Sequence, residues 1–286
     1  MWISEINNIV RGACGGFLFG IPLLYTMEVW WIGSLAKPQM MLVAIMLTFI
    51  VVYLLNRTEG FRKYKTADLP YKAVIDTVES IAIGTCCAAF MLILLCEITL
   101  DNFLRESVGK IIFESVPFSI GVALSNQFLG DNRNETSSGR NDTQSNQGQN
   151  QSDELQATLS DIGGTLIGAT VIAFNIAPTD EIPMLAAAVS PSWLLIVILT
   201  SLLISYAIVF ESGFSNQQKR RQQRGIFQRP SSETIASYLI SLMAAAFMLW
   251  FFQKLTFSDP WTMWLDYSLL LGLPASIGGA AGRLAL

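Results

Sequence analysis

Two short acidic segments stand directly after long apolar stretches of the chain. Glu28 in "TMEVWW" follows the apolar residues of "GGFLFGIPLLY", and Asp180 and Glu181 in "TDEI" follow a second apolar stretch that opens "GGTLIG". A carboxylate in apolar surroundings is costly unless it binds a cation, a proton or a hydrogen-bond donor. Because the arrangement occurs twice, these three acids are the first candidates for a cation-binding or proton-binding site.

Four hydroxyl side chains accompany the acids. Thr26 and Thr179 each stand two residues before a glutamate, and Ser119 and Ser276 lie in the matching segments "PFSIG" and "PASIG". A hydroxyl beside a helix-bending proline can bond freed carbonyl groups or line a polar path. We therefore expect all four to belong to the same cation or proton pathway as the acids.

The second acidic segment is the more irregular one. Pro178 and Pro183 bracket it, and proline removes a backbone donor and clashes with the preceding turn, which predicts an unwound helix. Gly168 also lies five residues further from Thr179 than Gly20 does from Thr26. The first segment has no such bracket, so Glu28 is expected about 24 Å along a continuous helix. The alternatives are a plain turn at Asp180 and Glu181 and a headgroup-level cap at Glu28.

The composition indicates a membrane protein. Of 286 residues 52% are hydrophobic and 14% charged, and the mean hydropathy is +0.46, whereas a soluble domain carries about 25% charged residues. There is no histidine, and the four cysteines lie inside apolar stretches without zinc spacing. Proton chemistry would therefore use carboxylates, and no metal, cofactor or enzymatic activity is expected, since no nucleotide-binding or nucleophile motif appears.

The hydropathy pattern predicts an all-α polytopic membrane protein with eight transmembrane helices. The spans are expected at 11–33, 38–55, 76–99, 107–128, 161–186, 191–210, 233–255 and 262–285. They form two parallel four-helix repeats, 1–129 and 158–286, joined by a polar, flexible linker at 130–157 that has almost no apolar residues.

An internal duplication supports this division. Residues 26–61 match 179–214 without a gap at an offset of 153, which aligns Glu28 with Glu181. Residues 76–129 match residues 233–286 at an offset of 157, where "AFML" aligns with "AFML" and "PFSIG" with "PASIG". Glu97 and Lys254 then share one repeat position with opposite charges, and they would pair if both face the repeat axis.

Positive charge predicts the orientation. The loops after the second and sixth spans are basic, and placing both in the cytoplasm leaves only four of the 18 Lys and Arg residues outside, namely Lys37, Arg105, Lys110 and Lys254. Both termini and the linker are then cytoplasmic, in a multi-pass protein of a bacterial inner membrane. Two copies of equal orientation would bring Glu28 and Glu181 face to face around an axis along the membrane normal. The glycine faces of the first and fifth spans predict tight helix packing, and one expectation is that these two spans pack against each other.

The strings "GIPLLYTMEVWW" and "NIAPTDEIPMLAA" are similar to an uncharacterised family of integral membrane proteins from cyanobacteria and some proteobacteria. The similarity covers residues 12–60 and 160–215 but not the linker. It implies a membrane location, and it supplies neither an activity nor catalytic residues.

The sequence as a whole favours a cation channel or a cation/proton transporter with paired intramembrane carboxylates near the outer side. Its partners would be membrane lipids and an inorganic cation or proton, without nucleic acid, and a homo-oligomer stays open. An integral-membrane enzyme or lipid-handling protein that uses the same carboxylates is the first alternative. A membrane sensor or assembly factor without transport is the second.

Overall fold

The computed structural model describes residues 2–58, 69–129, 150–211 and 230–285. Every regular element in these residues is a helix, which confirms the all-α prediction. The first half of the chain contains α1 (Trp2–Leu24), α2 (Met27–Leu35), α3 (Pro38–Thr58), α4 (Leu69–Leu94) and α5 (Leu104–Leu129). The second half contains α6 (Asn150–Ile176), α7 (Glu181–Ala188), α8 (Leu194–Tyr206), the π-helix η1 (Ala207–Glu211), α10 (Pro230–Phe251) and α11 (Trp261–Ala285).

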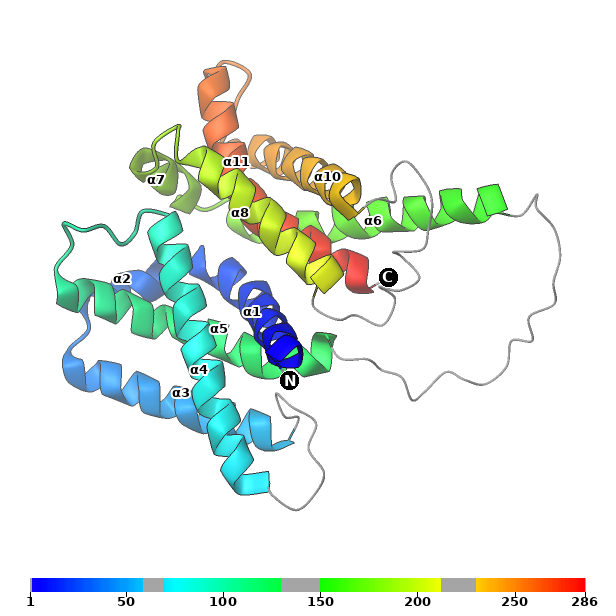
Figure 1. Cartoon of the computed structure of the whole chain (residues 1–286). Coiled ribbons are helices and arrows are strands. Elements are labelled where there is room, and N and C mark those ends of the chain that lie inside the picture. The colour runs from blue at the N-terminus through cyan, green and yellow to red at the C-terminus, as the bar shows by residue number, and fades with distance from the viewer. Residues whose placement is uncertain (1, 59–68, 130–149, 212–229, 286) are drawn as a thin grey trace.

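The two halves lie beside each other. Figure 1 shows α1–α5 in the lower part of the view and the helices of the second half in the upper part. Among the described residues, four helices are long and apolar enough to cross a membrane, at Pro38–Arg57, Tyr71–Leu94, Leu104–Ser125 and Pro230–Phe251. The number rises to six if each of two bent helix pairs is one span. A multi-span membrane protein is thus confirmed, and the count of eight stays a prediction.

Both acidic segments lie at sharp breaks between helices. The axes of α1 and α2 differ by 85° across Tyr25 and Thr26, and those of α6 and α7 differ by 88° across residues 177–180. The unwinding predicted around Pro178 is present. The continuous helix predicted over 11–33 is wrong. No proline lies within the first break itself, at Tyr25 and Thr26.

The first break has a local physical cause. Pro22, in the last turn of α1, has no N–H, so that turn lacks one of its backbone hydrogen bonds. The hydroxyl and N–H of Thr26 then both donate to the carbonyl of Leu23. The hydroxyl and N–H of Thr179 bond the carbonyl of Ile176 in the same way at the second break. Both helices therefore end with a threonine whose hydroxyl and N–H donate to the carbonyl three residues earlier.

The glycine faces pack within each half. Gly15 of α1 lies against Gly121 of α5, and Gly168 of α6 lies against Gly278 of α11. The expectation that the first and fifth spans pack on each other is wrong, because each packs on the last long helix of its own half. Gly168 is thus structurally equivalent to Gly15, and the two residues are 153 positions apart, the same offset that aligns Glu28 with Glu181. The second copy therefore has no five-residue excess at this point.

We expect Gly168→Ala to destabilise the protein by about 1–3 kcal/mol, the usual range for overpacking a tight contact. The added methyl group would overlap the backbone carbonyl of Gly278, which cannot turn aside as a side chain would. Gly163 of the same helix is the matched control, since a Cβ there meets nothing within 4 Å. Gly163→Ala should be neutral or stabilising by up to about 1 kcal/mol. Thermal unfolding in detergent measures both, and equal stabilities would contradict the packing described.

Two loops repeat each other in detail. The residues after α4 and α10, Cys96 and Gln253, both have φ 59°, a left-handed conformation that non-glycine residues seldom adopt. Three residues later Thr99 bonds the side chain of Asn102 through its N–H and hydroxyl, as Thr256 bonds Asp259. Each residue of the second loop lies 157 positions after its counterpart, so the two loops share one backbone design.

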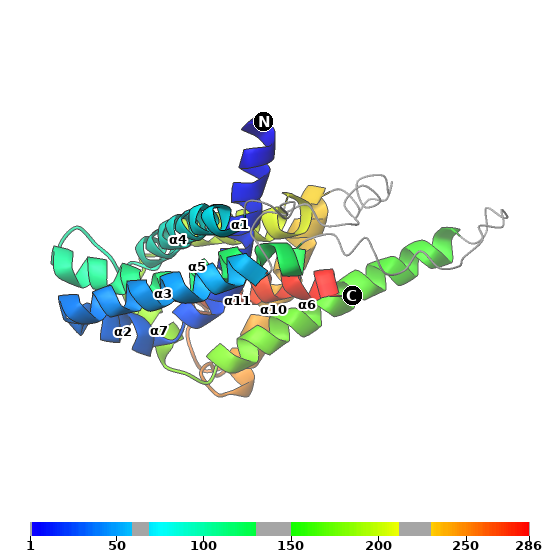
Figure 2. The same ribbon diagram turned by 90° about the horizontal axis from the view of Figure 1, so that it is seen from below.

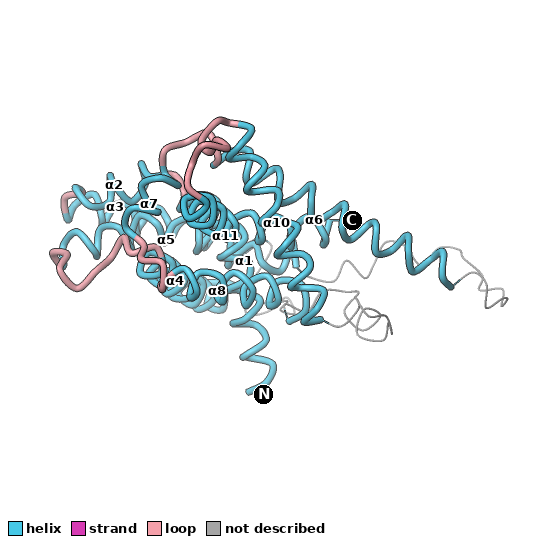
Figure 3. The backbone as a smooth tube through the Cα atoms, turned by 90° about the horizontal axis from the view of Figure 1, so that it is seen from above, coloured by secondary structure: helices cyan, strands magenta, loops and turns pink. Residues whose placement is uncertain are grey.

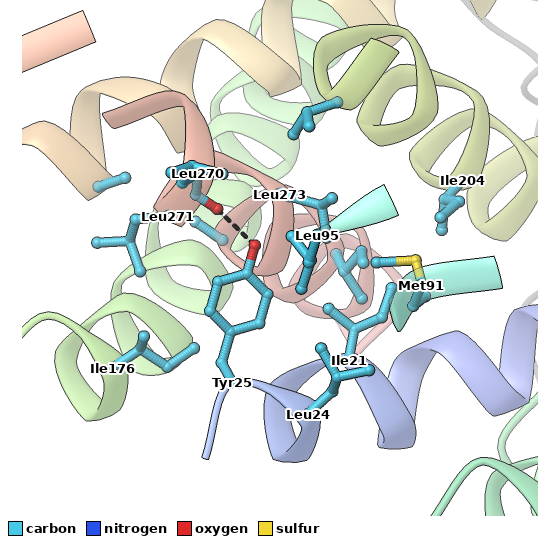
Figure 4. Close-up of a cluster of buried hydrophobic side chains, with 14 of the residues drawn as sticks. Ile21, Leu24, Tyr25, Met91, Leu95, Ile176, Ile204, Leu270, Leu271 and Leu273 are labelled. Atoms are coloured by element: carbon cyan, nitrogen blue, oxygen red, sulfur yellow. Dashed lines mark hydrogen bonds between the residues drawn. The ribbon is translucent and has the colours of Figure 1, made fainter. Parts of the chain in front are cut away.

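Buried contacts join the halves. The Tyr25 hydroxyl, beside the first break, donates to the carbonyl of Leu270 in α11 at 2.8 Å (Figure 4). The indole N–H of Trp193, before α8, donates to the carbonyl of Leu94 at 2.7 Å. Apolar side chains from both halves form one continuous core around these bonds. The halves are therefore docked as one packed unit.

The linker predicted at 130–157 is described only at its end. Residues 130–149 lie outside the described part of the chain, and α6 begins at Asn150, inside the range predicted as linker. The first turns of α6 project beyond the packed helices (Figures 2 and 3). Most of the described loops lie toward the opposite end of the molecule, where Figure 3 shows them in pink.

Candidate functional site

The second break presents one buried and one exposed acid. Glu181 is the first residue of α7 and is only 8% exposed. Its Oε2 atom is buried and has no hydrogen-bond partner among the described residues. The carboxylate of its neighbour Asp180 is largely exposed and forms an ion pair with Lys254 at 2.7 Å. Glu181 is therefore the predicted ligand with an oxygen left free to bind a cation or hold a proton.

The first break differs. Glu28 is the second residue of α2 and is exposed to the surroundings of the protein. The helix α2 packs on α5, whereas α7 packs on α11. No hydrogen bond or ion pair joins Glu28 to Glu181 within the described residues. The face-to-face arrangement of two equal ligands stays a prediction, and the two acids have unequal surroundings.

The four hydroxyl residues divide into pairs. Thr26 and Thr179 close the ends of α1 and α6 at the breaks, so they lie directly beside the acids. Ser276 is buried in α11, where its hydroxyl donates to the carbonyl of Leu273 at 2.8 Å. Ser119 is fully buried in α5 and its Oγ has no partner among the described residues. The serines lie inside the two halves rather than at the breaks.

The opposite charges at the shared repeat position do not pair with each other. Glu97, in the loop after α4, lies 3.5 Å from the ammonium of Lys110, which also lies 3.0 Å from Glu106. Lys254 bonds Asp180 instead. Each member of the aligned pair thus has a partner from its own half, because these loops cover the ends of their own helices.

Lys110 is the centre of the first of these ion-pair groups. Only 6% of the residue is exposed, and its ammonium donates to the backbone carbonyl of Glu97 at 2.9 Å and lies 5.3 Å from the ring centre of Trp30. Burial raises the pKa of the Glu97 carboxyl, and Lys110 lowers it by a smaller amount. The group fixes α2, α5 and the loop after α4 to one another.

A fourth acid is more deeply buried than the three acids at the helix breaks. Glu114 lies on α5 with no exposed surface, and neither carboxyl oxygen has a partner among the described residues. The duplication does not single out this residue, because the aligned position in the second half is the apolar Leu271. Its position ten residues inside an apolar span was the signal that could have singled it out.

No group of three or more His, Cys, Asp or Glu residues in the described ranges could hold a metal ion. The acids at the breaks can instead bind a monovalent cation together with backbone carbonyls, or hold a proton.

Comparison with known proteins places the chain among membrane proteins. A family model described as "Putative integral membrane protein (DUF2391)" matches residues 8–286. The comparison with curated proteins and that with solved structures gave no match.

Proposed function

Since the chain belongs to this family of integral membrane proteins, whose model matches residues 8–286, we propose that it conducts cations or exchanges cations for protons across the membrane. One observation carries the proposal. Both bent helix pairs break where an acidic residue follows within three positions of the bend, at Glu28 and at Asp180 and Glu181.

An interrupted helix in a bilayer persists only where protein or water satisfies the freed backbone groups. The carbonyls at the end of a broken helix, next to a carboxylate, are suitable ligands for a dehydrated cation. An acid in the first turn also complements a helix dipole, but such a role gives no reason to bury Glu181 with an oxygen left unbonded. The site is a binding and conducting one, and no enzymatic step is assigned to it.

The architecture we infer is two parallel four-helix repeats of one duplicated unit, in which each bent pair, the short helix α8 with η1, and α11 count as spans beside the four long apolar helices. The common geometry of the breaks, of the loops at Cys96 and Gln253, and of the glycine contacts supports it, because all recur at offsets of 153 or 157. The different exposure of Glu28 and Glu181 makes the two copies functionally unequal.

For the orientation we propose cytoplasmic termini in a bacterial inner membrane. The basic loops after the second and sixth expected spans support this choice. A cysteine introduced at Ser145, which lies outside the described residues, should react in intact cells with membrane-permeant but not with impermeant thiol reagents. Labelling by the impermeant reagent would show that the protein has the opposite orientation.

Cation flux from proteoliposomes tests the proposed function. Vesicles loaded with Li⁺, Na⁺ or K⁺ that contain the protein should release at least one of these ions faster than protein-free vesicles do. If the protein is folded and inserted, and yet each of the three ions is released no faster than from protein-free vesicles, the proposal is overturned.

A further inference from the structure

We propose that Glu114 is a proton-binding site in the first half of the protein, and that its proton exchanges with water admitted at the break between α1 and α2. The part that this proton plays in transport rests on the proposed function. The binding of the proton does not, and it is tested separately below.

The burial of Glu114 is the first observation. The residue lies within the apolar span Leu104–Ser125, has no exposed surface, and its two carboxyl oxygens lack partners in the described part of the chain. Removing a charged carboxylate from water without a compensating partner is among the costliest events in a protein. The negative charge of this side chain therefore has to be compensated, by a bound proton or by a bound cation.

The second observation is the helix face on which Glu114 lies. Residues four apart on a helix share a face, so Glu114 lies between Lys110 and Phe118. Phe118 packs against Gly20 near the end of α1, and Lys110 lies over the ring of Trp30 in α2. The break at Tyr25 and Thr26 falls between these two contacts along the chain. Glu114 consequently faces the break.

Access to Glu114 is closed along the rest of this face. Gly121 and Ser125, two and three turns further along α5, meet Gly15 of α1, where backbone lies directly on backbone. Such a contact leaves no room for a chain of water molecules. On the other side Lys110 and its acids fill the space. Thr26 at the break is exposed, so the interrupted backbone is where we infer that water reaches the carboxyl group.

The surrounding charges do not neutralise Glu114. Lys110, on the same helix, is held by the loop carbonyl of Glu97 and by two carboxylates. The Tyr25 hydroxyl of α1 donates to Leu270 on the other side. The helix α3 has no charged side chain before Arg57, near its far end. Contacts of Gly20 and Gly84 with residues 118 and 119, and of Gly33 and Glu97 with residues 109 and 110, bracket Glu114 on α5. The titratable residues of the bracketed segments are Tyr25, Glu28, Cys86, Cys87, Cys96, Glu97 and Lys110.

A proton fits this site better than a metal cation. A dehydrated cation needs several oxygen ligands in a shell, and Glu114 offers one carboxyl group with an apolar phenylalanine one turn away. A proton needs one oxygen. On release the O–H bond of the acid breaks, the proton passes to a water molecule at the break, and the carboxylate keeps the electron pair. The second half has Leu271 at the matching position, so this proton site belongs to the first half, and Glu181 of the second half remains for the cation.

Infrared spectroscopy of the full protein in lipid tests the assignment without any flux measurement. A protonated carboxyl group shows a C=O stretching band well separated from that of a carboxylate. We expect such a band near neutral pH, its loss in Glu114→Gln, and a shifted band in Glu114→Asp, which keeps the carboxyl group. Glu97→Gln is the control and should leave the Glu114 band in place.

The outcomes separate this proposal from the transport proposal. A band that persists unchanged in Glu114→Gln would overturn the assignment, as would its absence from the unchanged protein. Stabilisation by Na⁺ or K⁺ that disappears in Glu114→Gln, without a C=O band, would identify a cation in place of the proton. If the band is assigned to Glu114 but no cation flux is found, the proton site stands and the transport function fails.

Discussion

Replacement of Glu181 by glutamine is expected to reduce cation flux through the reconstituted protein by about tenfold or more. It removes the charge of the break-site acid that is buried with an oxygen lacking a partner among the described residues. Glutamine keeps the shape and most of the hydrogen-bonding capacity, so the folded protein should survive. Flux from ion-loaded proteoliposomes, normalised to inserted protein, measures the effect.

Two further variants give this prediction its controls. Glu28→Gln should reduce flux less, since Glu28 is exposed and is not enclosed by protein as Glu181 is. Asp101→Asn removes an exposed acid from the loop after α4 and should leave flux unchanged if only the break acids matter. Equal losses in all three variants would mean that general surface charge, not the break site, governs flux. A loss of expression in Glu181→Gln with normal flux in the remaining protein would indicate a structural role.

Lys110→Met is expected to destabilise the protein by about 3 kcal/mol or more, the usual cost of removing one partner from a buried ion pair. The substitution leaves the carboxyl of Glu97, whose side chain is 12% exposed, without its cation and removes the contact with the ring of Trp30. Thermal unfolding in detergent measures the loss. The double variant Lys110→Met, Glu97→Gln should recover part of it, because no uncompensated charge then remains.

The loss in Lys110→Met should also depend on pH. Burial already raises the pKa of Glu97 in the folded protein, and without Lys110 the opposing effect is gone. The folded state then binds a proton at Glu97 more tightly than the unfolded state does, so stability falls as the pH rises from the unfolded pKa through the folded one. The destabilisation should be larger at about pH 8 than at about pH 5. A loss of equal size at both values would show that charge burial is not its cause.

The sequence was sufficient for the helical class and for the location of the second break, for identifiable reasons. Membrane helices are read from apolar length alone, and Pro178 marks the second break by a local rule that needs no tertiary information. The first break escaped prediction because its cause is distributed over Pro22 and Thr26 in a helix that reads as continuous. A hydroxyl that closes a helix end looks in sequence like any threonine in an apolar span.

The surroundings of the acids could not be predicted in the same way. Glu28 and Glu181 align in sequence, yet one is exposed and the other buried, and this difference depends on how α2 and α7 dock on different helices. Glu114 was visible as an acid in an apolar span, but its full burial and its place opposite the break depend on the contacts of Phe118 and Lys110 with α1 and α2. Alignment locates equivalent positions, whereas burial is set by packing.

Cation flux through the double variant Glu28→Gln, Glu181→Gln tests the central claim most directly, because it removes both aligned break acids while keeping the backbone and side-chain shapes. The break-site account predicts a folded, inserted protein whose flux of the conducted cation falls close to that of protein-free vesicles, and little below that of Glu181→Gln alone, since groups that act as one site are not additive. Full cation flux through the well-folded double variant would contradict the claim that the acids at the two helix breaks form the cation pathway.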